Sequence, residues 1–156
     1  MKFPNPVFAD FVWAALVLEG RLFAIPVILA GLVIEYFFVR KLTGFNIKRS
    51  IVADVTMNAV SLLLGIALIP LAGLAWEFSA GSLLYEQFKI GSFGYVAWTA
   101  TITLSVLINA VIENFVLRRI FKLEKTKAAF RWLCLANTLS VGIAFASFWF
   151  FPIKYF

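Results

Sequence analysis

The sequence predicts an all-α integral membrane protein, built from four transmembrane helices that form two parallel two-helix repeats. Hydrophobic residues make up 63% of its 156 residues and charged residues 14%, whereas soluble domains are about half apolar and a quarter charged. Several segments are apolar over the roughly 20 residues that a helix needs to cross a bilayer. A short motif that contains a glutamate recurs in two of these segments. Together these features predict the class, the number of spans and their arrangement.

Four segments qualify as transmembrane spans, and we expect them to form a single membrane domain over residues 1–156. They are residues 22–39, 51–76, 94–117 and 129–152. The second is the longest, and Pro70 within it predicts a kink because proline lacks the N–H of the helical hydrogen bond. Two shorter apolar stretches, 7–19 and 82–90, carry charges and are predicted as short helices at the outer interface.

The recurring motif reads VIEYFFVR at 33–40 and VIENFVLR at 111–118. In both copies a glutamate, Glu35 or Glu113, precedes an arginine by five residues. Chance similarity between apolar helices with basic flanks would explain the arginines. Chance similarity of this kind would not explain a glutamate at the same position in both copies. We therefore predict an internal duplication.

The spans that follow the motif also correspond. Asn58 and Ser61 match Asn137 and Ser140 after one added residue in the second connection. Because each repeat holds an even number of spans, the two repeats run parallel and are related by a pseudo-two-fold axis along the membrane normal. The predicted repeats are about residues 7–76 and 82–152.

Basic residues predict the orientation in the membrane. Ten of the fourteen lysines and arginines lie in two connections between spans. They are Arg40, Lys41, Lys48 and Arg49 in one, and Arg118, Arg119, Lys122, Lys125, Lys127 and Arg131 in the other. The positive-inside rule places both connections in the cytoplasm, and therefore both termini and the loop 77–92 outside. We expect the inner (plasma) membrane of a prokaryote, with anionic lipid against the basic loops.

Polar residues form one stripe along each span, since side chains three or four residues apart share a helix face. The stripes predict a polar cluster in the inner half of the bundle, made of Glu35, Asp54, Asn58, Glu113, Arg131 and Asn137. Asp54 and Arg131 lie at similar depths, and we expect an ion pair between them. In a structural interpretation, the glutamates snorkel or pair with nearby arginines, and the asparagines join helices. In a functional interpretation, the cluster binds or relays a proton, a cation or a small cationic solute.

The composition argues against an enzyme and against a metal or cofactor. Histidine is absent and Cys134 is the only cysteine, so chemistry that needs histidine or paired cysteines is excluded. No phosphate-binding loop or nucleophile motif occurs, and only a cation site made of oxygen ligands remains open. The net charge of +6 comes from membrane-flanking loops, so we expect no nucleic-acid partner.

Two functions fit this pattern. The first is a pseudo-symmetric transporter or channel for a proton, a cation or a small solute, which works as a homo-oligomer because four helices enclose little volume. The alternative is a non-catalytic subunit or interaction partner of another membrane protein, with an assembly, sensor or immunity-type role. Transport by the purified protein alone separates the two.

The predicted orientation determines where introduced cysteines react. In a Cys134→Ala background, Lys48→Cys and Lys122→Cys should react with a membrane-impermeant maleimide only after the membrane is opened. Ser79→Cys should react in intact cells, because it lies on the outer side. Labelling of either basic-loop cysteine in intact cells would overturn the orientation.

Overall fold

The computed structural model describes residues 24–88, 95–124 and 126–150, and the regular structure in these ranges is helical. The elements are α2 (Ile25–Thr43), α3 (Ile47–Trp76), the π-helical turn η1 (Glu77–Gly81), α4 (Ser82–Phe88), α5 (Tyr95–Arg119) and α6 (Thr126–Phe150). The all-helical prediction is confirmed, and the four long helices coincide with the predicted spans to within a few residues. The helix predicted at 7–19 lies outside the described residues.

Among the residues that the structure describes, three helical stretches are long and apolar enough to cross a membrane: Ile47–Leu84, Tyr95–Arg119 and Lys127–Phe148. These stretches indicate a membrane protein. The helix α2 is not among them, and its 19 residues include the charged Glu35, Arg40 and Lys41. Membrane crossing by α2 and the four-span repeat arrangement therefore stay predictions.

The helix α2 turns small and polar residues inward and large apolar residues outward. Its buried residues recur every four positions: Val27, Gly31, Glu35 and Val39. On its other side Leu29, Val33 and Phe37 are 57%, 59% and 62% exposed. A helix of a soluble protein buries its large apolar residues against the core. The reversed pattern is typical of a helix whose outer side meets lipid or another apolar surface.

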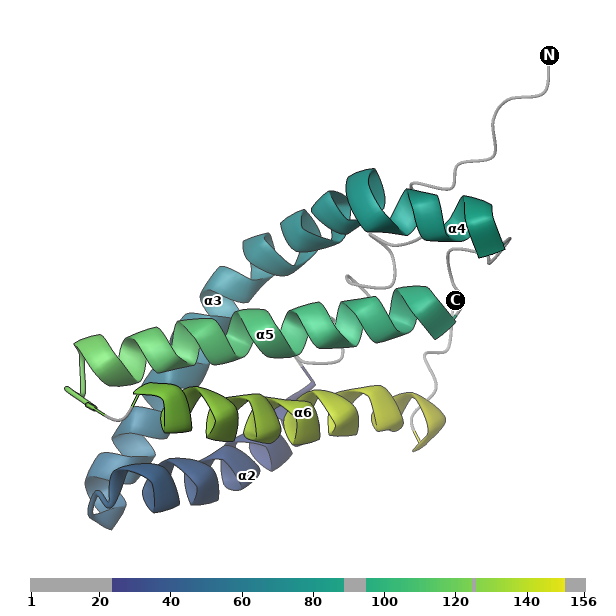
Figure 1. The fold of residues 1–156 in the computed structure, drawn as a ribbon. Coiled ribbons are helices and arrows are strands. Elements are labelled where there is room, and N and C mark those ends of the chain that lie inside the picture. Colours follow the sequence, from purple (N-terminus) through teal and green to yellow (C-terminus); the bar gives the residue numbers. More distant parts are fainter. Residues whose placement is uncertain (1–23, 89–94, 125, 151–156) are drawn as a thin grey trace.

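The four long helices pack as a ring in which each contacts two neighbours. The most extensive contacts are between α3 and α5 and between α2 and α6, and the α5–α6 and α2–α3 contacts complete the ring. Figure 1 shows α5, α6 and α2 stacked on one another, with α3 running obliquely to them. The ring surrounds the polar side chains that were predicted to cluster, except for Arg131, which is exposed.

The α2–α3 and α5–α6 connections lie at the same end of the bundle, on the left in Figure 1. They touch: the Arg49 guanidinium donates from Nη2 to the Phe121 carbonyl at 3.3 Å. The rings of Phe45 and Phe121 are 6.4 Å apart between centroids. The basic residues that flank both connections therefore gather at one end, as the predicted topology requires. The side of the membrane that this end faces stays a prediction.

The turn between α2 and α3 is set by a glycine and an asparagine. Gly44 ends α2 with a φ of 68°, and its N–H donates to the Arg40 carbonyl at 3.0 Å. Asn46 begins α3, because its Oδ1 accepts a hydrogen bond from the backbone N–H of Arg49 at 2.9 Å. A left-handed glycine followed by an asparagine cap lets the chain reverse in a few residues.

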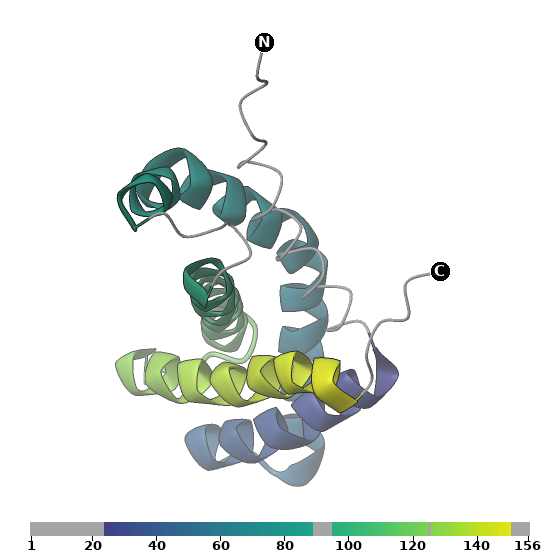
Figure 2. The ribbon, with the colours of Figure 1, turned by 90° about the vertical axis from the view of Figure 1, so that its right-hand side faces the viewer.

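The helix α3 continues through Pro70 and into η1 and α4. Figure 2 shows it bending as it approaches α4, and Pro70 removes one helical hydrogen bond along the way. The prediction of a loop at 77–92 is wrong over its first part, because the wider π-helical turn redirects the chain without ending the helix. The short helix predicted at 82–90 is present as α4, and residues 89 and 90 lie outside the described part.

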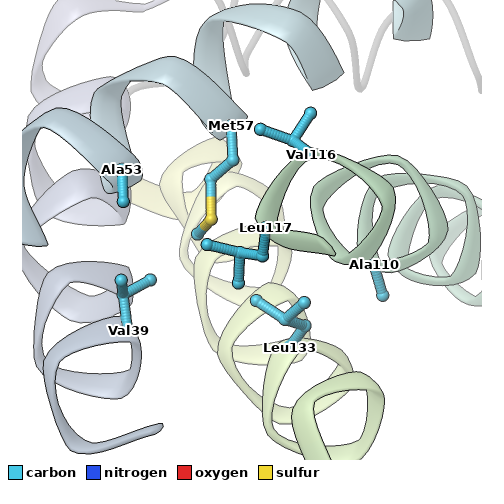
Figure 3. Packing of buried hydrophobic residues seen from close by; sticks show 7 residues of the cluster. All are labelled: Val39, Ala53, Met57, Ala110, Val116, Leu117 and Leu133. Carbon is cyan, nitrogen blue, oxygen red and sulfur yellow. The ribbon is translucent and has the colours of Figure 1, made fainter. Parts of the chain in front are cut away.

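Seven buried apolar side chains fill the basic end of the bundle: Val39, Ala53, Met57, Ala110, Val116, Leu117 and Leu133. Figure 3 shows Met57 of α3 beside Leu117 of α5, with Val39 of α2 and Leu133 of α6 nearby. All four long helices contribute to this cluster. Along α3 and α5 these apolar residues alternate with the polar ones, because Asp54 lies between Ala53 and Met57, and Glu113 lies between Ala110 and Val116.

The positive φ of Gly44 predicts a matched pair of glycine substitutions. Gly44→Ala should lower stability by about 1 kcal/mol or more, because alanine is strained in the left-handed region. Gly142→Ala is the control, since Gly142 lies within α6 with open space around its missing Cβ. That change should be neutral or stabilising by up to about 1 kcal/mol. Thermal unfolding in detergent measures both, and equal effects would contradict the role given to Gly44.

Candidate functional site

Glu35 lies on the inward stripe of α2 and is 2% exposed. Its Oε2 accepts a hydrogen bond from Asn58 Nδ2 of α3 at 2.7 Å. The side chain of Ser140, on α6, lies near the same carboxyl group. Three helices therefore meet at Glu35. Its partners are an amide and a hydroxyl.

Glu113, on α5, has the same kinds of partner and is 1% exposed. Its Oε2 accepts from Asn137 Nδ2 of α6 at 2.6 Å. Its Oε1 lies 3.4 Å from Ser61 Oγ of α3. Each glutamate thus meets an asparagine from the next long helix in the chain and a serine from the other helical hairpin.

The two asparagines and the two serines are also held alike. Asn58 Nδ2 donates to the Asp54 carbonyl at 3.0 Å, and Asn137 Nδ2 donates to the Leu133 carbonyl at 3.1 Å. Both acceptors lie four residues earlier in the helix. The hydroxyls of Ser61 and Ser140 lie 3.1 and 3.3 Å from the carbonyls of Asn58 and Asn137. A serine hydroxyl carries one proton, so it donates either to its own helix or to a glutamate.

Both glutamates are therefore buried within the bundle among neutral partners. Their five-residue distance from an arginine predicted interfacial groups that snorkel or form ion pairs. Within the described residues, no ion pair reaches either glutamate, and Arg40 donates to the Tyr36 hydroxyl at 3.3 Å. The interpretation of Glu35 and Glu113 as interfacial anchors is wrong. The idea that Asn58 and Asn137 join helices agrees with their hydrogen bonds.

Asp54 joins the cluster, and Arg131 does not. Asp54 is 3% exposed, and its Oδ1 lies 3.3 Å from Asn58 Nδ2. Arg131 is exposed, and no ion pair joins it to Asp54, so the predicted bridge is wrong. The reason is helical phase. Asp54 is four residues before Asn58, and the residue four before Asn137 is the buried Leu133. Arg131 is two residues earlier, about 200° around the helix.

The three buried carboxyl groups of Glu35, Asp54 and Glu113 interact electrostatically with one another. Within the described residues, no lysine or arginine pairs with them. Like charges buried together without a counter-ion are unfavourable. A proton or a cation would therefore stabilise this cluster. The described residues contain no group of three or more His, Cys, Asp or Glu side chains placed to hold a metal ion.

A pocket of about 260 Å³ lies between α2 and α3. Its polar lining comes from all four long helices: Glu35, Asn58, Ser61, Asn109, Asn137 and Ser140. Gly31 and Gly65 make room for it. A Cβ on Gly31 would lie 3.5 Å from Ser140 Cβ, and one on Gly65 would lie 3.9 Å from Asn109 Oδ1. Glu113 lies behind the pocket and is reached through Ser61 and Asn137.

Asn109, Ser61 and Ser140 belong to this site, although the sequence did not select them as site residues. Their signal was present, because each lies on a predicted polar stripe. Two further hydroxyls on the α5 stripe, those of Thr101 and Ser105, are buried and have no hydrogen-bond partner in the described part of the chain. The stripes therefore contain more polar groups than form hydrogen bonds within the cluster.

The short hydrogen bond between Asn137 and Glu113 predicts coupled effects on stability. Asn137→Leu should lower stability by about 1–3 kcal/mol, because it leaves a buried carboxyl group without its nearest donor. Adding Glu113→Met should lower it by less than the sum of the single changes, with a coupling of about 0.5–3 kcal/mol. Thr138→Leu, at the exposed neighbouring position, should change stability by about 0.5 kcal/mol or less. Strictly additive losses in detergent unfolding would show that the pair does not interact.

No family model, no curated protein and no solved structure matches this chain, so the site is interpreted from its own chemistry.

Proposed function

We propose that the protein is a small membrane transporter or channel that binds a proton or a cation at Glu35 and Glu113. The observation that carries the proposal is the pair of buried glutamates, 2% and 1% exposed, with amide and hydroxyl partners and no basic partner in the described residues. A carboxyl group buried in a membrane protein is costly and usually faces a partner or a pathway. Here the hydrogen-bond partners are neutral, so a mobile cation or proton would neutralise the charge of the carboxylates.

The proposal includes four spans in two parallel repeats, with α2 as the first span. The matching partners of the two glutamates support the duplication, because chance similarity would not also pair Asn58 with Glu35 and Asn137 with Glu113. The common end of the two connections supports a parallel arrangement. Each repeat would then supply one glutamate and one asparagine to a shared site.

The two glutamates are connected, which favours a site that works as one unit. Asn137 lines the pocket beside Glu35 while its amide donates to Glu113. Ser61 also lines the pocket and lies near Glu113 Oε1. A proton or cation that binds in the pocket at Glu35 would then affect Glu113 through these two side chains.

The exposed apolar surface supports an oligomeric form. Leu29, Val33 and Phe37 form one exposed row on α2, which suits either acyl chains or a second copy. Four helices around a 260 Å³ pocket leave little room for a continuous path, so we propose a homo-oligomer. The basic end would contact anionic lipid headgroups.

Flux measurements on the purified protein test this function. In liposomes with an imposed pH gradient and potential, the protein should carry protons or monovalent cations, followed with pH-sensitive and cation-sensitive dyes. Glu35→Gln and Glu113→Gln should each reduce flux by about tenfold or more. The double change should be little worse than either, because the two groups act together.

Glu124→Gln is the control for the loss of a carboxylate, since Glu124 is exposed in the α5–α6 connection. It should leave the flux unchanged. Folded protein with no flux, or full flux in the Glu35→Gln, Glu113→Gln variant, would reject the transport site. The alternative role as a non-catalytic subunit would then be tested by purification with a bound membrane partner.

A further inference from the structure

The walls of the α2–α3 pocket are chemically divided. The polar part of the lining includes the buried Glu35 carboxyl and the Asn109 amide. The side towards the surface is apolar and includes Leu32, Val55 and Ile66. An ion that keeps its water shell gains nothing from the apolar walls. A molecule with a charged end and an apolar body satisfies both parts.

The opening of the pocket is on the outer side of α3. Val55 and Ile66 line the pocket and are 49% and 48% exposed, and Ala59 between them is exposed as well. Packing between α2 and α3 is less extensive than between the other neighbouring pairs of long helices. Because α3 belongs to a stretch that is long enough to cross a membrane, this opening would face the acyl chains.

The size of the pocket and the charge of Glu35 restrict the class of ligand that can bind. At about 30 Å³ for each water-sized group, the pocket of about 260 Å³ holds about nine such groups. When it is ionised, the Glu35 carboxylate accepts hydrogen bonds and carries a negative charge. It therefore selects a positively charged N–H donor. The asparagine side chains around it offer further acceptor oxygens.

We propose that the pocket binds a small lipophilic ammonium ion, a primary amine on an aromatic or branched alkyl body, which enters from the bilayer between α2 and α3. The ammonium group lies at Glu35, and the apolar body lies along Leu32, Val55 and Ile66. This inference names the substrate class of the proposed transport site and rests on that function. It differs from a pure proton or alkali-cation site, which would not need the apolar walls.

Binding of 2-phenylethylammonium to the protein in nanodiscs of neutral phosphatidylcholine tests the proposal. Equilibrium dialysis should give saturable binding. The neutral 2-phenylethanol should bind at least about tenfold more weakly, since it lacks the charge. Methylammonium should also bind at least about tenfold more weakly, since it lacks the apolar body. Glu35→Gln should weaken amine binding by about tenfold or more, and Glu124→Gln should not change it.

A matched pair on α3 tests the entry route. Ala59→Phe fills the opening and should reduce amine binding by about tenfold or more. Ala67→Phe places the same ring on an exposed position of α3 outside the pocket, and should leave binding unchanged. A second measurement does not depend on a bulky change. In a Cys134→Ala background, the amine should slow the reaction of Ala59→Cys with a lipid-soluble maleimide, but not that of Ala67→Cys.

Equal binding of the amine and the alcohol, or no protection of Ala59→Cys, would overturn the proposal. If proton or alkali-cation flux persists in the same preparation and depends on Glu35, the transport function stands and only the substrate class fails. If the protein neither binds the amine nor carries any ion, the proposed function fails with it.

Discussion

The burial of two carboxyl groups in an apolar bundle determines how the four long helices approach one another. A buried carboxyl group must be hydrogen-bonded or neutralised, and each glutamate obtains an asparagine from one neighbouring helix and a serine from another. These contacts require short distances between helices. Gly31 lies at such a contact on α2, since a Cβ there would lie 3.5 Å from Ser140 Cβ. The polar cluster therefore constrains how the helices pack, and it is also a candidate site.

The apolar residues follow from the same constraint. The side of α2 that carries Glu35 is used for small and polar contacts, so its large apolar residues are left on the outer side. The largest cluster of buried apolar residues includes Met57, Leu117 and Leu133, which pack together. This arrangement is stable only if the environment around the outer surface of the bundle is also apolar. A membrane or a partner protein supplies that environment, whereas water does not.

The sequence predicted the helices well because their signals are local. Long apolar runs place the four long helices to within a few residues of their observed bounds. It also selected Glu35, Asn58, Glu113 and Asn137, because repeated polar positions on shared faces are visible in one dimension. It did not predict depth or pairing. In the structural interpretation Glu35 snorkels or pairs with a nearby arginine, but the direction of its side chain depends on helix phase and on Asn58. Arg131 was matched to Asp54 by depth alone, and a shift of two residues turned it to the outside.

The two halves of the cluster have similar hydrogen bonds, but the free volume beside the two glutamates differs. The position four residues before Glu35 is Gly31, whereas the position four before Glu113 is Asn109. The position four after Ser61 is Gly65, and the one four after Ser140 is the buried Ala144. Both glycines line the pocket beside Glu35, and Asn109 reaches toward Gly65. Under the proposed duplication, these substitutions would open a pocket at one glutamate and fill the corresponding space at the other. Glu35 would then contact the ligand, while Glu113 would respond to it through Ser61 and Asn137.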